Sequence, residues 1–98
     1  MRVFDDENGV MNKSLLDIPG SGIMLVSNFT LYGDVSRGFR PSYIGAAPRD
    51  ISEPIFSSFV DYFESVYSDR IVIAKCRFGA MMEIELVNDG PVTLILER

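Results

Sequence analysis

The feature that most constrains this 98-residue chain is a turn-forming cluster, Asn88-Asp89-Gly90-Pro91, set between two strand-like runs. Residues 82–86 alternate apolar and charged side chains, and residues 92–96 are β-branched and apolar, which is typical of β-strands. Gly90 can adopt positive φ and Pro91 has no N–H to donate, so the cluster predicts a rigid corner with free backbone carbonyls. An ordinary hairpin turn has the same composition, so this spacing alone does not define a site.

Two more stretches indicate strands in the N-terminal third. Residues 2–11 predict an edge hairpin, whose acidic turn contains an Asn8-Gly9 pair suited to a type I′ turn. Residues 23–32 are apolar and β-branched enough for a central strand. Alternation along that strand puts Asn28 and Thr30 on one face, which is either a pocket wall or a solvent-facing edge.

A helix is predicted to begin at Asp50 or Ser52 and to end near residues 68–69. Asp50 with Glu53 has the spacing of a capping box, whereas Ser52 as N-cap would put Pro54 in the first turn. Apolar residues recur every three or four positions and predict one face packed on the core: Ile55, Phe56, Phe59, Val60, Phe63, Val66 and Tyr67.

The order of these elements indicates the fold class. A strand at residues 71–75 follows the helix, and the two C-terminal runs complete the series. Strands and one long helix in this order predict an α+β fold, a mostly antiparallel β-sheet packed with one main helix. We expect residues 1–98 to form a single domain.

Composition excludes several classes of function. The chain has no histidine, so Ser-His-Asp and Cys-His catalysis within one chain are excluded, and the usual zinc ligand is missing. The acidic turn at residues 5–7 has no suitably spaced partner oxygens, so no metal is predicted. Glu83 and Glu85 are interpreted as the exposed face of a strand and not as an acid–base pair. No apolar run approaches the roughly 20 residues of a membrane span, so we expect a cytoplasmic protein.

The charge distribution limits how nucleic acid can be bound. A net charge of −5 argues against a protein that wraps a duplex, because broad phosphate contact requires a basic surface. Arg37, Arg40 and Arg49 cluster in a Gly/Pro-rich segment. These arginines either contact a few phosphates or are solvated loop residues, and the sequence leaves both alternatives open.

Several collinear motifs resemble those of the D-aminoacyl-tRNA deacylases, also called D-tyrosyl-tRNA deacylases. Residues 86–93 are similar to the C-terminal signature of that family. Ser27-Asn28-Phe29-Thr30-Leu31-Tyr32 is similar to its Ser-Gln-Phe-Thr-Leu-Tyr, with Asn28 where the family usually has Gln. Further matches lie at residues 37–42, 46–48, 78–80 with Met82, and 2–4. The resemblance spans nearly the whole chain and implies that residues 1–98 correspond to the C-terminal two thirds of the family domain.

The resemblance implies an activity and an assembly. The reaction is hydrolysis of the ester that joins a D-amino acid to the terminal adenosine of tRNA, releasing D-amino acid and free tRNA as chiral proofreading in translation. No cofactor is implied. The expected assembly is a homodimer in which Gly90-Pro91, with a cis peptide bond, reaches across the interface into the partner's pocket.

The resemblance also assigns site residues. Ser27, Asn28, Phe29 and Thr30 form the catalytic group, in which N–H groups around Phe29 and Thr30 stabilise the oxyanion. No base accompanies the Thr30 hydroxyl, so covalent catalysis is not expected. The resemblance implies instead that a neighbouring ribose hydroxyl of the substrate orders the attacking water. The substrate-binding group is Gly90, Pro91, Phe78, Gly79, Ala80, Met82 and Ala47, with Phe78 and Met82 at the adenine.

A second interpretation is a truncated, catalytically inactive homologue that acts as a dimerising or tRNA-end-binding module. In the family, strands and a helix precede the part that this chain matches. Loss of strands exposes unpaired sheet edges and loosens the packing behind a site. The 98-residue chain is therefore expected to hydrolyse D-aminoacyl-tRNA poorly or not at all.

Overall fold

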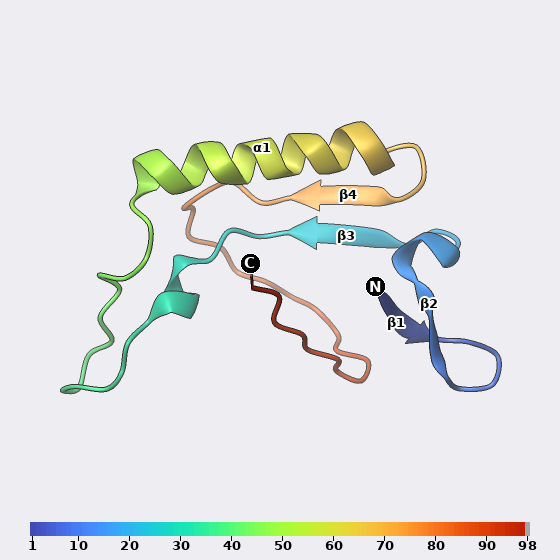
Figure 1. Ribbon diagram of the computed structural model, residues 1–98, viewed down its shortest axis with the longest axis horizontal. Helices are drawn as coiled ribbons and strands as arrows, with labels where there is room; N and C mark the ends of the chain where they lie inside the picture. The colour runs from blue at the N-terminus through green and yellow to red at the C-terminus, as the bar shows by residue number, and fades with distance from the viewer. Residues whose placement is uncertain (98) are drawn as a thin grey trace.

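The computed structural model describes residues 1–97. Their elements, in chain order, are β1 (Arg2–Asp5), β2 (Met11–Ser14), the 3-10 helix η1 (Leu15–Asp17), β3 (Gly22–Leu25), the 3-10 helix η2 (Phe29–Tyr32), α1 (Arg49–Tyr67) and β4 (Val72–Lys75). Figure 1 shows α1 lying along β4 and β3, with the β1–β2 hairpin and the C-terminal segment below them. The α+β class with one main helix and an antiparallel strand pair is confirmed.

The predicted N-terminal hairpin forms, but not through a type I′ turn. Strands β1 and β2 pair antiparallel, with Asp5 opposite Met11. A carboxylate oxygen of Asp6 accepts from the N–H groups of Asn8 at 2.9 Å and Val10 at 3.1 Å. Only Gly9, at φ 74°, has positive φ in this turn, whereas type I′ needs it at two successive residues. The Asp6 carboxylate thus selects a different turn, which residue pairs alone do not reveal.

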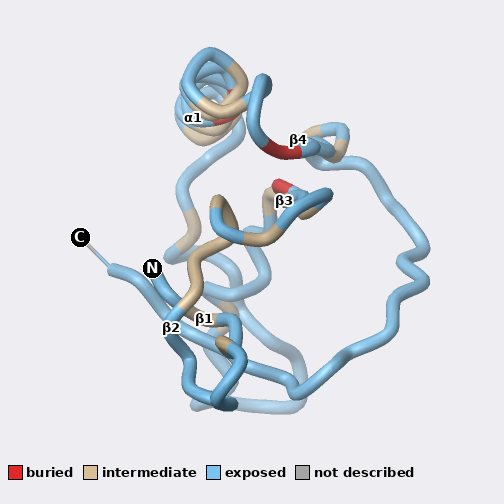
Figure 2. The backbone as a smooth tube through the Cα atoms, turned by 90° about the vertical axis from the view of Figure 1, so that its right-hand side faces the viewer, coloured by how far each residue is buried: buried red, intermediate tan, exposed pale blue. Residues whose placement is uncertain are grey.

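Strands β3 and β4 pair parallel, in a register that runs from Gly22 opposite Val72 to Leu25 opposite Lys75. A parallel pair needs a long crossover, and α1 supplies it. The sequence predicted a mostly antiparallel sheet and did not foresee this parallel pair. Leu25, Val60 and Ile71, with 7, 4 and 7% of their surface exposed, are the buried apolar residues of the described chain. They lie where α1, β3 and β4 meet (Figure 2).

Helix α1 begins at Arg49, with Pro48 as N-cap, and ends at Tyr67. Both predicted starts are therefore wrong. Glu53 does not complete a capping box with Asp50 but pairs with Arg49, and the Ser52 hydroxyl donates to the Pro48 carbonyl at 3.0 Å. Pro54 consequently lies inside the helix rather than in its first turn.

The predicted apolar face of α1 is only partly covered. Val60 is buried, and Phe56, Phe63 and Tyr67 are half-buried. Ile55, Phe59 and Val66 remain exposed, with 65, 47 and 42% of their surface accessible. The packed side is reinforced by aromatic contacts and by an ion pair of 2.8 Å from Lys75 of β4 to Glu64. Apolar spacing thus identified the helix but overestimated how much of it this chain buries.

The two predicted C-terminal strands do not form. Residues 82–86 and 92–96 contain no strand, although apolar side chains recur along both runs. A strand needs a hydrogen-bonding partner, and neither run has one among residues 1–97. Apolar side chains along these runs, such as Ile84, Leu86 and Leu94, are consequently more than half exposed. The radius of gyration is 16.4 Å, whereas a compact domain of this length has about 13 Å.

Candidate active site

The predicted catalytic motif, residues 27–30, lies just after β3, where the chain turns into η2. The predicted strand over residues 23–32 ends at Leu25, and residues 29–32 form the 3-10 helix instead. Asn28 is the N-cap, and its Oδ1 accepts from the Thr30 N–H at 3.0 Å and from the Thr30 hydroxyl at 2.6 Å. Asn28 and Thr30 therefore come together through a local turn and not on one face of a strand.

These hydrogen bonds change the expected roles in the motif. The Thr30 N–H is engaged by Asn28, so it is not free to stabilise an oxyanion in this structure. The Phe29 N–H, the first of η2, has no acceptor among residues 1–97 and is available. The Thr30 hydroxyl donates to an amide oxygen, which is not a base. The geometry therefore supports a backbone donor and not a serine- or threonine-type nucleophile.

A hollow of about 380 Å³ opens beside Phe29. Its walls come from three segments: η2, the loop leading into the first turn of α1, and the turn that follows β4. The lining residues are Phe29, Tyr43, Ala46, Ala47, Pro48, Arg49, Ser52, Phe78 and Gly79. We call this hollow the aromatic pocket. It brings together Phe29, Ala47, Phe78 and Gly79, which the sequence had assigned to the site from three separate motifs.

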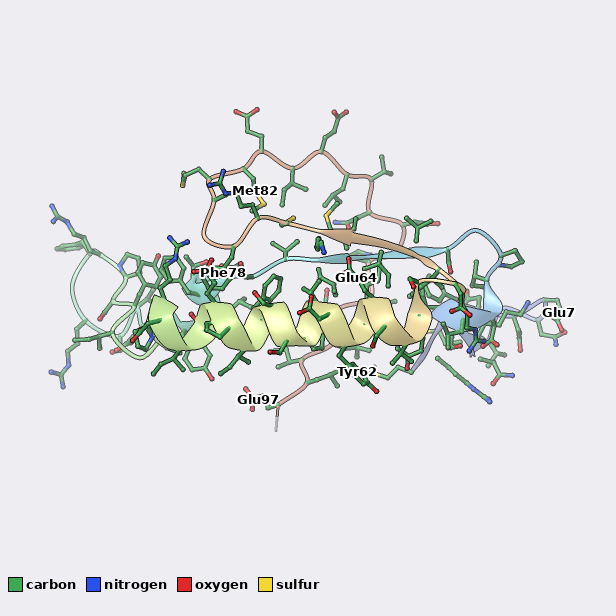
Figure 3. All side chains as sticks on the ribbon, turned by 90° about the horizontal axis from the view of Figure 1, so that it is seen from above. Glu7, Tyr62, Glu64, Phe78, Met82 and Glu97 are labelled. Carbon is green, nitrogen blue, oxygen red and sulfur yellow. The ribbon has the colours of Figure 1, made fainter. Side chains whose placement is uncertain are left out.

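The aromatic pocket has flat apolar walls and one cation. The rings of Phe29 and Tyr43 meet edge to face with centroids 5.2 Å apart. Phe78 lies beside the N-terminal half of α1 (Figure 3), and the Arg49 guanidinium sits 5.8 Å from its ring centroid. Gly79, at φ 64°, makes the turn after Phe78 in a conformation that disfavours larger residues. Partly exposed aromatic rings with a nearby cation suit a nucleobase attached to phosphate.

The cation of the aromatic pocket is held in place by an ion pair. Arg49 Nε lies 2.8 Å from Glu53 Oε2, one helical turn along α1. The hydrogen bond from Arg49 lowers the pKa of Glu53, and the same contact raises the pKa of Arg49. Arginine is charged at neutral pH in any surroundings, and the ion pair orients the Arg49 guanidinium in this structure. Arg49 was one of three loop arginines in the sequence, and no pattern singled it out. Tyr43 carried no signal, and Ser52 was noted only as a candidate N-cap of the helix.

The Gly90-Pro91 corner lies elsewhere in the chain. The Gly90–Pro91 peptide bond is cis, as predicted, and Gly90 has φ 123°. Pro91 lines a second hollow of about 360 Å³ with Val3, Phe4, Asn88, Asp89, Val92 and Leu94. The two hollows share no lining residue. In Figure 1 this turn of the C-terminal segment lies near the β1–β2 hairpin, away from η2.

The remaining predicted site residues do not line the aromatic pocket. Ala80 and Met82 follow its wall in sequence, but Met82 lies beyond β4 and is 40% exposed (Figure 3). Ser27 precedes η2 and is half-buried. Within residues 1–97 no three acidic or cysteine side chains are arranged to hold a metal ion, and no helix is long and apolar enough to cross a membrane.

Comparison with known proteins identifies the family of this chain. The model of the family described as D-Tyr-tRNA(Tyr) deacylase matches residues 1–97. The D-aminoacyl-tRNA deacylase of Thermosipho africanus is 50% identical over 97 residues, covering 99% of this chain and 62% of that protein. The corresponding protein of Desulfatibacillum aliphaticivorans is 46% identical over 97 residues, covering 99% of this chain and 64% of its own length.

A solved structure gives the same result for the fold. The c-Myc DNA Unwinding Element Binding Protein superposes with a TM-score of 0.78 at 36% identity, over 99% of this chain and 64% of that one. The chain thus spans less than two thirds of the length of these two curated relatives. The match of the family model to residues 1–97, with relatives this similar, shows that the chain belongs to the D-Tyr-tRNA(Tyr) deacylase family.

Proposed function

We propose that this protein hydrolyses the ester bond of D-aminoacyl-tRNA, releasing the D-amino acid and free tRNA. The observation that carries the proposal is the aromatic pocket, which joins Phe29 of the catalytic motif to Phe78 and Gly79. Family membership supports the same substrate class, because the relatives that match are named D-aminoacyl-tRNA deacylases. In the proposed complex the terminal adenine stacks on Phe78, which places the adjoining ester toward η2. The proposed substrate implies a cytoplasmic protein.

The proposed reaction uses groups of the backbone and of the substrate. A water molecule attacks the ester carbonyl carbon, oriented by the ribose hydroxyl next to the ester. The Phe29 N–H donates to the oxyanion that forms on the carbonyl oxygen. Collapse of this intermediate breaks the bond to the ribose oxygen, which takes up the proton lost by the water. No side chain is consumed or acylated, which agrees with a Thr30 hydroxyl that has only an amide as its partner.

The second part of the proposal is a homodimer in which Gly90-Pro91 of one chain enters the aromatic pocket of the other. Within one chain the Gly90-Pro91 corner and the aromatic pocket have no lining residue in common. A dimer in which each chain supplies its corner to the partner's pocket would bring the two together. The exposed apolar side chains of the C-terminal segment offer surface for such an interface. A rigid Gly-Pro backbone would accept hydrogen bonds from the substrate amino group and exclude an L-side chain whatever its identity.

A change in the substrate tests the chemistry of the proposal. D-tyrosyl-tRNA with an intact terminal ribose is expected to be hydrolysed, whereas the analogue with the ester-adjacent hydroxyl replaced by hydrogen is expected to be inert. Release of D-tyrosine in single-turnover assays is the readout, with the uncatalysed rate of each substrate as control. Equal acceleration of both substrates would contradict the proposed role of the ribose hydroxyl.

A further inference from the structure

The loop between η2 and α1 contains a closed substructure that the proposed reaction does not use. Asp34 and Ser42 form an antiparallel bridge, with N–H to carbonyl distances of 2.8 and 2.9 Å. The Asp34 side chain also accepts from the Ser36 N–H at 2.8 Å, and Gly38 turns the chain at φ 72°. We call residues 34–42 the arginine loop. Figure 1 shows the chain between η2 and α1 projecting away from the body of the molecule.

The tip of the arginine loop exposes an aromatic ring between two cations. Its sequence is Arg37-Gly38-Phe39-Arg40, and Phe39 has a relative exposure of 108%. Neither arginine forms an ion pair within residues 1–97, although the chain carries 14 acidic residues and a net charge of −5. Burial and ion pairing in the described chain therefore do not account for this arrangement. An exposed ring flanked by arginines is how proteins bind single-stranded nucleic acid.

The base of the arginine loop is built into the wall of the aromatic pocket. Tyr43 follows Ser42 directly, lines the pocket and packs edge to face on Phe29 at 5.2 Å. On the other side, Gly33 packs so closely that an added Cβ would lie 3.0 Å from the Tyr43 ring. The C-terminal end of the loop therefore joins the pocket wall at Tyr43, and its N-terminal end begins beside that residue at Gly33. Arg49 adds a further positive charge at the same rim.

We propose that the arginine loop binds the unpaired nucleotides that precede the terminal adenosine of the RNA. Phe39 stacks on one base, while Arg37 and Arg40 bind backbone phosphates. This inference rests on the proposed function only for the position of the terminal adenosine in the aromatic pocket. Stacking and phosphate binding involve no base-specific hydrogen bonds, so the loop recognises a single strand and not its sequence. Local binding of this kind reconciles an RNA ligand with an acidic chain.

Fluorescence anisotropy with labelled RNA tests the inference on the chain itself. The probe is a four-nucleotide single strand with the sequence CCA at its 3′ end, and a blunt RNA duplex is the comparison. The double variant R37A/R40A should weaken binding of the single strand at least about tenfold at low salt. It should also make the log–log dependence of affinity on salt shallower by about 0.7 for each phosphate that the variant no longer neutralises. F39A should weaken binding by roughly 5- to 100-fold and leave the salt dependence unchanged.

A charge-matched control separates the loop from the general effect of net charge. The double variant R2A/R70A removes the same charge from β1 and from the turn between α1 and β4, which lie away from the loop (Figure 1). It should bind the single strand within about twofold of the parent chain. Equal weakening in the two double variants, unchanged binding in R37A/R40A, or equal affinity for strand and duplex would each overturn the inference. Thermal melting by circular dichroism checks that all variants fold alike.

Hydrolysis of an ester without upstream nucleotides distinguishes failure of this inference from failure of the proposed function. D-tyrosyl-adenosine has no upstream nucleotides, so R37A/R40A should hydrolyse it as fast as the parent chain does. If the parent chain hydrolyses neither this ester nor D-tyrosyl-tRNA, the proposed function fails while the RNA-binding result still decides the role of the loop. If R37A/R40A loses hydrolysis of both substrates equally, the loop serves the pocket and not the upstream strand, which overturns the inference.

Discussion

The Thr30 hydroxyl donates to Asn28 Oδ1 at 2.6 Å, and the chain contains no histidine that could deprotonate it. We therefore expect Thr30→Ala to keep at least about one tenth of the parental kcat/KM on D-tyrosyl-tRNA, because loss of a true nucleophile costs roughly 10⁴-fold or more. Single-turnover hydrolysis provides the measurement. A loss beyond about 10³-fold, together with a trapped acyl-enzyme in the parent chain, would show that Thr30 is a covalent nucleophile.

At the level of single residues, motifs predicted some of the residues that come together at the pocket but not how those residues are held. Phe29, Ala47, Phe78 and Gly79 were assigned from the sequence and do line one pocket. The hydrogen bond from the Thr30 N–H to Asn28 was not predicted from the sequence. Whether a short polar side chain bonds to a nearby backbone group and replaces a strand depends on the local backbone geometry, which a residue pattern does not show. Tyr43 and Arg49 reach the pocket through the path of a long loop, which no local pattern specifies.

Among the elements, the pairing of β3 with β4 depends on a close approach at Gly22. A Cβ added there would lie 2.9 Å from the Val72 carbonyl oxygen and 3.1 Å from the Val72 Cβ. Gly22→Ala is expected to push the strands apart and to destabilise the chain by roughly 1–3 kcal/mol. This corresponds to a fall in melting temperature of about 4–8 °C for each kcal/mol.

Gly45→Ala is the matched control for that prediction. An added Cβ at Gly45 meets nothing within 4 Å, and Gly45 is not among the residues with positive φ. We expect its stability to stay within about 0.5 kcal/mol of the parent chain. Thermal melts of the two variants under identical conditions make the comparison. Equal melting temperatures for both would mean that the β3–β4 packing at Gly22 is looser than described.

The elements also show where sequence patterns stop being informative. The hairpin and α1 were predicted because turn chemistry and helical spacing act within a few residues. The parallel pairing of β3 with β4 depends on residues about 50 positions apart, so local pattern could not reveal it. Residues 82–86 and 92–96 have strand composition without a strand, because composition does not supply the partner on which a ladder depends.

For the whole molecule, carboxylate hydrogen bonds determine how stability responds to acid. The Val10 N–H lowers the pKa of Asp6, the Ser14 hydroxyl that of Asp17, and Arg49 that of Glu53. A lowered pKa in the folded state means that the unfolded state binds more protons as the pH falls, so acid removes stability. With no histidine to titrate, the melting temperature should be flat between about pH 5.5 and 7.5 and should fall below about pH 4. A stability transition near pH 6.5 in scanning calorimetry would contradict this.

The open shape of the chain predicts how stability depends on protein concentration. Its radius of gyration is 16.4 Å, and apolar residues such as Ile55, Leu86 and Leu94 are more than half exposed. If a second copy covers part of this surface, as the proposed dimer requires, association stabilises the folded state by mass action. The melting temperature should therefore rise with protein concentration while sedimentation shows a growing dimer fraction. A constant melting temperature and a monomer at all concentrations would contradict the dimer.

The proposed activity is tested most directly by the two enantiomers of one substrate. D-tyrosyl-tRNA and L-tyrosyl-tRNA are incubated with the chain at a concentration where the dimer dominates, and release of tyrosine is compared with the uncatalysed rate of each. In the proposed dimer a rigid Gly90-Pro91 backbone would exclude the L-side chain, so we expect acceleration of the D-ester alone, even if that hydrolysis is slow. Equal acceleration of the two esters, or none for the D-ester while the chain still binds the RNA, would contradict a chirally selective deacylase.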